Sequence, residues 1–147
     1  MKPSVLQLER AFFRRVEVNA QLGGAPSKNQ DIATTVSSGR AADNPLRFQV
    51  TLIVQLLDSA EKHAGYHGSV EVMGYFTLSD AVPEKDRDRT VVVHGCTLLF
   101  GMVREMVCAV TARGPWPMLT LPTMSFHDLV PMPAPPPASV NAPLAAS

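Results

Sequence analysis

Two neighbouring segments in which apolar and polar residues alternate constrain the fold more than any other feature of the sequence. Residues 48–56 and 66–79 each place an apolar side chain at almost every second position, and a polar turn at 58–65 separates them. A period of two residues is that of a β-strand with one buried face. The two segments therefore predict a hairpin whose apolar face belongs to the core.

Two further extended segments precede this hairpin. Residues 6–18 follow the same period, and their even positions hold Leu6, Leu8, Arg10, Phe12, Arg14, Val16 and Val18. This pattern predicts a long two-faced strand, which ends before Gly23 and Gly24. Residues 31–38 are rich in Thr and Ser and predict a short, polar edge strand.

The period changes to that of a helix in the second half of the chain. Large apolar residues recur three and four positions apart at Leu99, Val103, Met106 and Val110. They predict an amphipathic helix that ends at Gly114. Upstream of it, we expect a solvated connector at residues 83–89 and a short extended piece at 91–93 that stops at Gly95.

Prolines at positions 115, 117 and 122 exclude a helix from the segment that follows and predict an extended loop. This loop carries large apolar side chains without any regular period, namely Trp116, Met118, Leu119, Leu121, Met124 and Phe126. Residues 131–147 are mostly Pro and Ala without charge, which is typical of a disordered tail. We therefore expect one domain over residues 1–130 and a tail over 131–147.

Four strands followed by one helix predict an α+β fold with an antiparallel sheet. One helix is too narrow to cover four strands, so the remaining apolar area must contact another copy of the chain or a partner. The 13 acidic and 13 basic side chains give a formal charge of zero, which argues against nucleic acid or an anionic membrane as the partner. Without a signal-like segment or an apolar run of about 18 residues, we expect a cytosolic protein that does not cross a bilayer.

Catalytic and metal-binding patterns are weak in this sequence. A nucleophile elbow and a phosphate-binding loop are both missing, and the adjacent His127 and Asp128 precede the predicted tail. His63 with His67, and His94 with Cys96, have loose spacings for a metal site, so turn histidines and buried thiols explain them better. We expect no catalytic residues, no metal and no cofactor.

Residues 97–130, TLLFGMVREMVCAVTARGPWPMLTLPTMSFHDLV, resemble the most characteristic stretch of the SecB protein-export chaperones. The landmarks are Leu99-Phe100, Arg104-Glu105, Arg113-Gly114, Trp116-Pro117, Leu119, Leu121, Phe126 and Leu129. The N-terminal LQLERAFFRRVEV is similar to the first strand of that family. VVVHGCTLLF further resembles a divergent SecB-like branch, some of whose members accompany toxin–antitoxin pairs.

The resemblance implies a four-stranded antiparallel Greek-key sheet, with one long helix and a short C-terminal helical turn at 125–130 on one face. It also implies a dimer of dimers that works as an ATP-independent holdase for unfolded polypeptides. The client-binding groove would be formed by Phe12, Phe76, Trp116, Met118, Leu119, Leu121, Met124 and Phe126. The oligomer interface would be formed by Leu99, Met102, Val103, Arg104, Glu105 and Met106.

The chain departs from the family at the positions that meet the export ATPase SecA. The family presents acidic side chains there, whereas the aligned positions here hold Arg15, Asn19 and Ser69. This departure argues against delivery of clients to SecA. Two other readings stay open: a module dedicated to one partner, such as a shield for an antitoxin, and a hot-dog-like enzyme, in which the helix precedes most strands.

Overall fold

The computed structural model describes residues 1–59, 61–129 and 132–133. Its elements follow one another as β1 (Leu6–Ala20), β2 (Asp31–Arg40), β3 (Arg47–Leu57), β4 (Tyr66–Leu78), α1 (Glu84–Thr111) and β5 (Met132–Pro133). The four predicted strands and the predicted hairpin are confirmed. The α+β class is confirmed as well, since the four long strands are antiparallel and one long helix follows them.

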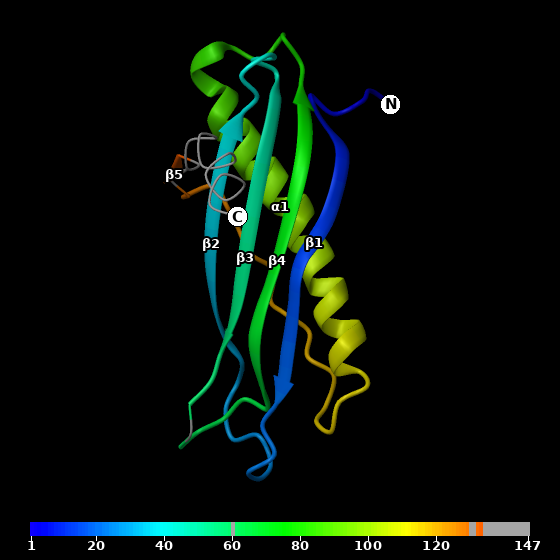
Figure 1. Cartoon of the computed structure of the whole chain (residues 1–147), viewed down its shortest axis with the longest axis vertical. Helices are drawn as coiled ribbons and strands as arrows, with labels where there is room; N and C mark the ends of the chain where they lie inside the picture. The colour runs from blue at the N-terminus through cyan, green and yellow to red at the C-terminus, as the bar shows by residue number, and fades with distance from the viewer. Residues whose placement is uncertain (60, 130–131, 134–147) are drawn as a thin grey trace, which may run out of the picture.

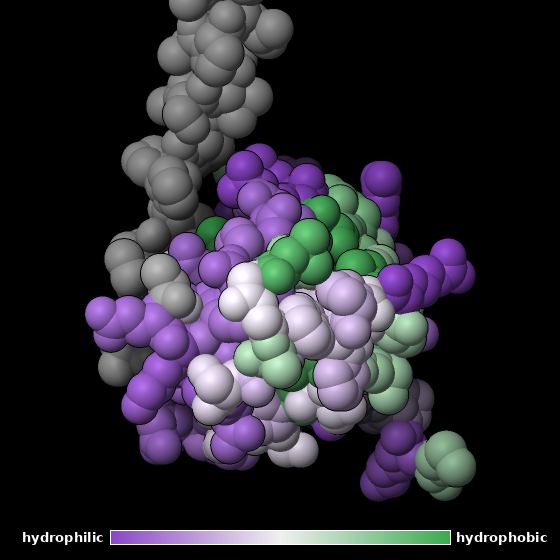
Figure 2. Space-filling model, turned by 90° about the horizontal axis from the view of Figure 1, so that it is seen from below, coloured by the Kyte–Doolittle hydropathy of each residue, from purple (hydrophilic) through white to green (hydrophobic). Residues whose placement is uncertain are grey.

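The strands form one sheet in the order β1-β4-β3-β2-β5. Strands β2, β3 and β4 are joined as consecutive hairpins, and β1 lies beside β4, which is the Greek-key arrangement. The connection at residues 21–30 takes the chain from one sheet edge to the other around the lower end in Figure 1. Viewed from that end in Figure 2, a group of apolar side chains lies among polar ones.

The core lies between α1 and one face of the sheet, where α1 runs diagonally across the strands (Figure 1). Alternate residues of β3 and β4 face the helix, and none of them is more than 3% exposed: Phe48, Val50, Leu52, Val54, Leu56, Val70, Val72 and Phe76. From the helix, Leu99, Val103 and Val107 meet them with no exposed surface. The apolar residues that recur at every second position in the hairpin and about every 3.6 positions in the helix thus pack against each other in one layer.

The helix is longer than the sequence pattern predicts. It starts at Glu84, directly after Pro83, so the predicted connector at 83–89 and the predicted extended piece at 91–93 are both wrong. Pro83 is well suited to a helix start, and Glu84 is one of two acidic residues in the first turn. Val91 and Val92 are β-branched, yet both are fully buried within the helix, so burial overrides their strand propensity.

Strand β1 does not keep one alternation along its length. Its pairing with β4 shifts register between Leu8 and Arg10 and again between Phe13 and Arg15. Each such bulge moves the following side chains to the other face of the sheet. Phe12, which the simple alternation places with Leu6 on the core face, therefore lies on the uncovered face, next to Tyr75 at 6.2 Å between ring centroids.

By length and hydropathy alone, α1 could cross a membrane. Half of its most apolar window is buried inside the protein, as is common for a core helix. After α1, Leu129 donates its backbone N–H to the carbonyl of Phe126, which forms a single turn at the predicted position. Of the predicted tail, Met132–Pro133 pair with β2, and the rest lies outside the described residues.

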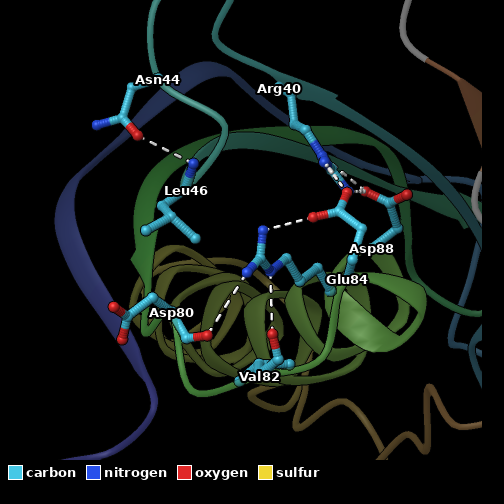
Figure 3. Close-up of polar contacts among 8 residues, drawn as sticks. Arg40, Asn44, Leu46, Asp80, Val82, Glu84 and Asp88 are labelled. Carbon is cyan, nitrogen blue, oxygen red and sulfur yellow. Dashed lines mark hydrogen bonds and ion pairs between the residues drawn. The ribbon is translucent and has the colours of Figure 1, made fainter.

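A cluster of charged side chains fastens the end of β2 to the first turns of α1 (Figure 3). The guanidinium of Arg40 contacts the carboxylate of Glu84 and lies 3.1 Å from that of Asp88. Arg87 joins the cluster through Glu84 and donates to the carbonyl of Val82 at 3.0 Å. The hydrogen bond from Arg40 lowers the pKa of Glu84 below its ordinary 4.5.

This lowered pKa predicts a pH-dependent contribution to stability. A carboxylate whose pKa is depressed on folding stabilises the fold above its unfolded pKa, and this contribution disappears as pH falls through the folded pKa. Arg40→Gln should therefore destabilise the protein more at pH 7 than at about pH 3. Urea unfolding at both pH values measures the difference. Arg113→Gln is the control, because Arg113 is exposed and makes no ion pair among the described residues. An Arg40→Gln effect of equal size at both pH values would contradict the assignment.

Candidate functional site

The post-helix loop, residues 115–129, runs extended beside α1 and is held there by backbone contacts. Thr111 accepts the N–H of Leu119 on its hydroxyl at 2.9 Å, and Arg104 donates to the carbonyl of Leu121 at 3.0 Å. Cys108 lies close enough to donate its S–H to the carbonyl of Leu119 at 3.3 Å. These bonds satisfy loop carbonyls and amides that no strand or helix pairs. The loop is therefore ordered although it has no regular secondary structure.

Part of the loop belongs to the core. Leu121 is 1% exposed and Phe126 is 2% exposed. The ring of Phe126 meets Phe100 of α1 edge to face, with 5.7 Å between ring centroids. Leu121 and Phe126 thus extend the apolar layer of α1 and, in this conformation, have almost no surface for a ligand.

Trp116 fastens the start of the loop to the lower end of the sheet. Its indole N–H donates to the carbonyl of Gln21 at 2.8 Å, which joins the loop to the β1–β2 connection. The hydroxyl of Tyr66 donates to the carbonyl of Trp116 at 3.2 Å and lies 3.3 Å from its amide nitrogen. The indole also packs on Gly65, where a Cβ atom would come within 3.0 Å of the ring. Together we call these contacts the Trp116 clamp.

Large apolar side chains remain exposed on both sides of this clamp. Met118 is 57% exposed, and Leu22, which follows Gln21, is 77% exposed. Leu119 and Met124 are partly buried against the core. Because the clamp joins the two segments, Leu22 and Met118 lie at the same end of the molecule, the end that Figure 2 shows. We call Leu22, Trp116, Met118 and Leu119 the end surface.

The eight residues predicted for the groove are divided between three places. Trp116, Met118 and Leu119 lie on the end surface. Phe76, Leu121 and Phe126 lie in the core with Met124 packed against it, and Phe12 lies on the sheet face that α1 leaves uncovered. Leu22 is absent from the residues predicted for the groove. In the sequence it is a single leucine beside two glycines, a pattern that indicates only the end of a strand. Its proximity to Trp116 depends on a contact 95 residues apart in the sequence.

The residues predicted for the oligomer interface are also divided. Leu99 and Val103 have no exposed surface because they pack on the sheet, and Arg104 bonds to the post-helix loop. Glu105 is exposed, and Met102 and Met106 are half-buried. The outward stripe of α1 also includes Leu98, 47% exposed, and Gly101, beside which a Cβ atom would meet nothing within 4 Å.

The structure brings no metal-type cluster together in the residues it describes: no three His, Cys, Asp or Glu side chains converge. His63 is buried against Trp116, with 6.1 Å between ring centroids, whereas His67 is exposed on β4. Burial raises the pKa of the Cys96 thiol to about 12, which keeps this side chain uncharged at neutral pH. Cys108 is half-buried.

Comparison with known proteins agrees with this geometry. The family model described as preprotein translocase subunit SecB matches residues 13–131. This chain belongs to the SecB family. Two protein-export proteins SecB, from Psychrobacter arcticus and Alcanivorax borkumensis, are each 25% identical to it over 125 and 133 residues. The matches cover 84% and 85% of this chain, and 84% and 83% of the relatives.

A SecB-like chaperone from Mycobacterium tuberculosis, solved with a peptide from an antitoxin, has the same fold. Its TM-score is 0.63 at 18% identity, over 86% of this chain and 93% of that one. The low identities mark a divergent SecB-family chain, as its residues at 15, 19 and 69 also indicate. The Greek-key sheet with one long helix is therefore that of a SecB-like protein.

The Trp116 clamp of this SecB-family chain predicts the effect of removing one hydroxyl. Tyr66→Phe should lower the free energy of unfolding by about 1 to 3 kcal/mol, because it removes hydrogen bonds to Trp116 and Thr111 from a buried position. Trp116 is the single tryptophan, so its fluorescence during urea unfolding reports on the clamp directly. Tyr75→Phe is the matched control on the uncovered face and should change stability by less than about 0.5 kcal/mol. Equal effects of the two variants would contradict the clamp.

Proposed function

We propose that this chain is an ATP-independent holdase chaperone, which binds unfolded or non-native polypeptides in the cytosol and keeps them soluble. One observation carries the proposal: the end surface exposes large apolar side chains whose backbone is fixed by hydrogen bonds. Membership in the SecB family supports a chaperone role. An unfolded client offers the complementary apolar side chains, which a folded protein hides.

A fixed backbone with flexible side chains suits a binder of many sequences. Met118 is unbranched and adapts to different client side chains. Because Trp116 is already held in place, less conformational freedom is lost on binding. A client that folds withdraws its apolar residues, so release needs competition by folding and no nucleotide.

One end surface binds weakly. A client that buries about five apolar side chains gains on the order of 8 to 15 kcal/mol, at about 1.5 to 3 kcal/mol each. Association costs about 4 to 15 kcal/mol, which offsets most of this gain. Several end surfaces on one oligomer that engage the same long client would raise avidity by about 10² to 10⁴.

We propose that the oligomer is a dimer of dimers in which the outward stripes of α1 meet. Met102, Glu105 and Met106 stay in this interface, and the exposed Leu98 and the open Gly101 join it. A glycine without nearby atoms lets a second helix approach closely. Leu99 and Val103 support the interface from the core, where they hold α1 on the sheet.

SecA is not part of the proposal. The positions that would meet it, Arg15, Asn19 and Ser69, lie on the uncovered face of the sheet. Arg15 is cationic and the other two are neutral, so these three positions lack the acidic side chains that the family presents there.

The holdase proposal predicts that wild-type protein, equimolar as a tetramer, suppresses light scattering by a chemically denatured model protein. The double variant Leu22→Asp, Met118→Asp should lose most of this activity, because two charges on the end surface repel apolar segments. Val5→Asp is the control: Val5 is also apolar and exposed, at 44%, but precedes β1 at the far end of the sheet. Scattering that wild-type protein leaves unchanged would contradict the proposal.

The oligomer proposal predicts a native mass near four times the 15.9 kDa of one chain. Leu98→Glu should lower that mass, because it places charges in the helix interface, while each smaller particle keeps its end surface. The end-surface double variant is the reciprocal control, since it should lose client binding at unchanged mass. Native mass spectrometry distinguishes the cases, and a monomeric wild-type chain would contradict the interface.

A dedicated partner is the second candidate function. The structural neighbour from Mycobacterium tuberculosis was solved with an antitoxin peptide, and the same kind of surface could serve one such partner here. Purification from the native host distinguishes the two functions. One stoichiometric partner favours the dedicated module, and a broad mixture of unfolded clients favours the holdase.

A further inference from the structure

The two long edges of the sheet differ in their protection against further pairing. Along β1, the register shifts at two bulges, at Glu9 and Arg14, and Arg10, Arg15 and Glu17 add charge. Bulges and charged side chains are the usual devices that prevent another strand from adding to a sheet edge. The β1 edge is therefore irregular and charged.

The edge formed by β2 has none of these devices. It pairs with β3 residue for residue from Asp31 to Arg40 without a register shift. Charges occur only at these two ends, and the residues between them are small, hydroxylated or aliphatic: Ile32, Ala33, Thr34, Thr35, Val36, Ser37, Ser38 and Gly39. A regular, uncharged edge of this kind is a template for an added strand.

Another part of the chain already pairs with the β2 edge. Met132–Pro133 form β5, which pairs in parallel with Ser37 and Ser38 on the outer side of β2. Figure 1 shows β5 beside β2, away from the edge formed by β1. The chain is anchored only three positions earlier, where Leu129 packs against the core and bonds to Phe126.

We propose that the outer edge of β2 is a strand-addition surface for extended client polypeptide, and that β5 is a built-in competitor for it. A client that adds there pairs through its backbone, which requires no particular sequence. The proposal rests on the holdase function and extends it: the end surface takes client side chains, and the β2 edge takes client backbone. A client must displace β5 to occupy the full edge.

The pairing of β5 is well placed and easily reversed. Among the residues that the structure describes, two pair with β2, and Pro133 has no N–H, so within β5 only Met132 can donate to β2. The tether at Leu129 compensates for this short pairing, because a short linker gives an effective concentration in the millimolar range. If β5 occupies the edge for about nine-tenths of the time, the apparent affinity for clients falls about tenfold.

Met132→Pro in the full chain tests the competition, because it removes the remaining N–H of β5. The Kd for a fluorescently labelled unfolded peptide should decrease by about 3- to 10-fold. Without peptide, the amides of β2 around Ser37 and Ser38 should exchange hydrogen faster than in wild-type protein. The matched control is Ala138→Pro, which adds a proline beyond β5 and should leave both measurements unchanged.

The outcomes separate this inference from the proposed function. Equal Kd values and equal exchange rates in wild type and Met132→Pro would overturn the competition by β5. A peptide methylated at alternate backbone nitrogens should bind Met132→Pro more weakly than the unmodified peptide, and equal binding would overturn strand addition. If no variant binds unfolded peptide, the holdase proposal fails instead, while the exchange rates still report whether β5 protects the β2 edge.

Discussion

The packing of α1 on the β3–β4 hairpin is the interaction on which the rest of the structure depends. Val103 and Val107 of the helix have no exposed surface, and Gly74 of β4 lets the helix approach the sheet, since a Cβ there would lie 3.0 Å from Leu99. This layer orients α1 diagonally across the sheet (Figure 1). Its direction determines where the post-helix loop begins and which part of the apolar face is left for that loop.

The loop then has two tasks that are usually in conflict. Its residues Leu121 and Phe126 extend the core, and its residue Met118 stays exposed to solvent. Both are compatible because the loop backbone next to Met118 is itself attached: Thr111 and Arg104 bond to the amide of Leu119 and the carbonyl of Leu121. An apolar surface can therefore be exposed and ordered at once. This combination suits a protein that must bind apolar segments without collapsing on itself.

The two edges of the sheet also differ in what they can bind. The bulges of β1 make its edge irregular and also turn Phe12 away from the core. Strand β2 keeps a regular edge, and its outer side is where β5 adds. The β2 edge thus offers backbone partners, whereas the apolar side chains of the end surface lie where β1 ends and β4 begins.

Local periodicity was sufficient to predict the four strands, their hairpin and the second half of α1. It failed where the secondary structure favoured by the local sequence differed from the one favoured by tertiary packing. The triplet at 91–93 favours a strand by propensity, yet burial on the sheet makes it helical. The bulges in β1 depend on its pairing with β4, which the alternation of Leu6, Leu8 and Phe12 does not reveal.

The candidate site shows the same limit. The prolines and apolar residues after α1 identified the loop, because proline excludes a helix and leaves the large side chains without a regular period. Composition could not distinguish Leu121 and Phe126, which are buried, from Met118, which is exposed. It could not find Leu22 either, since the bond between Trp116 and Gln21 joins residues 95 positions apart. The sequence by itself determined the elements and the loop, whose patterns are local. Which side chains face water was decided only by the tertiary structure, because exposure depends on neighbours distant in the chain.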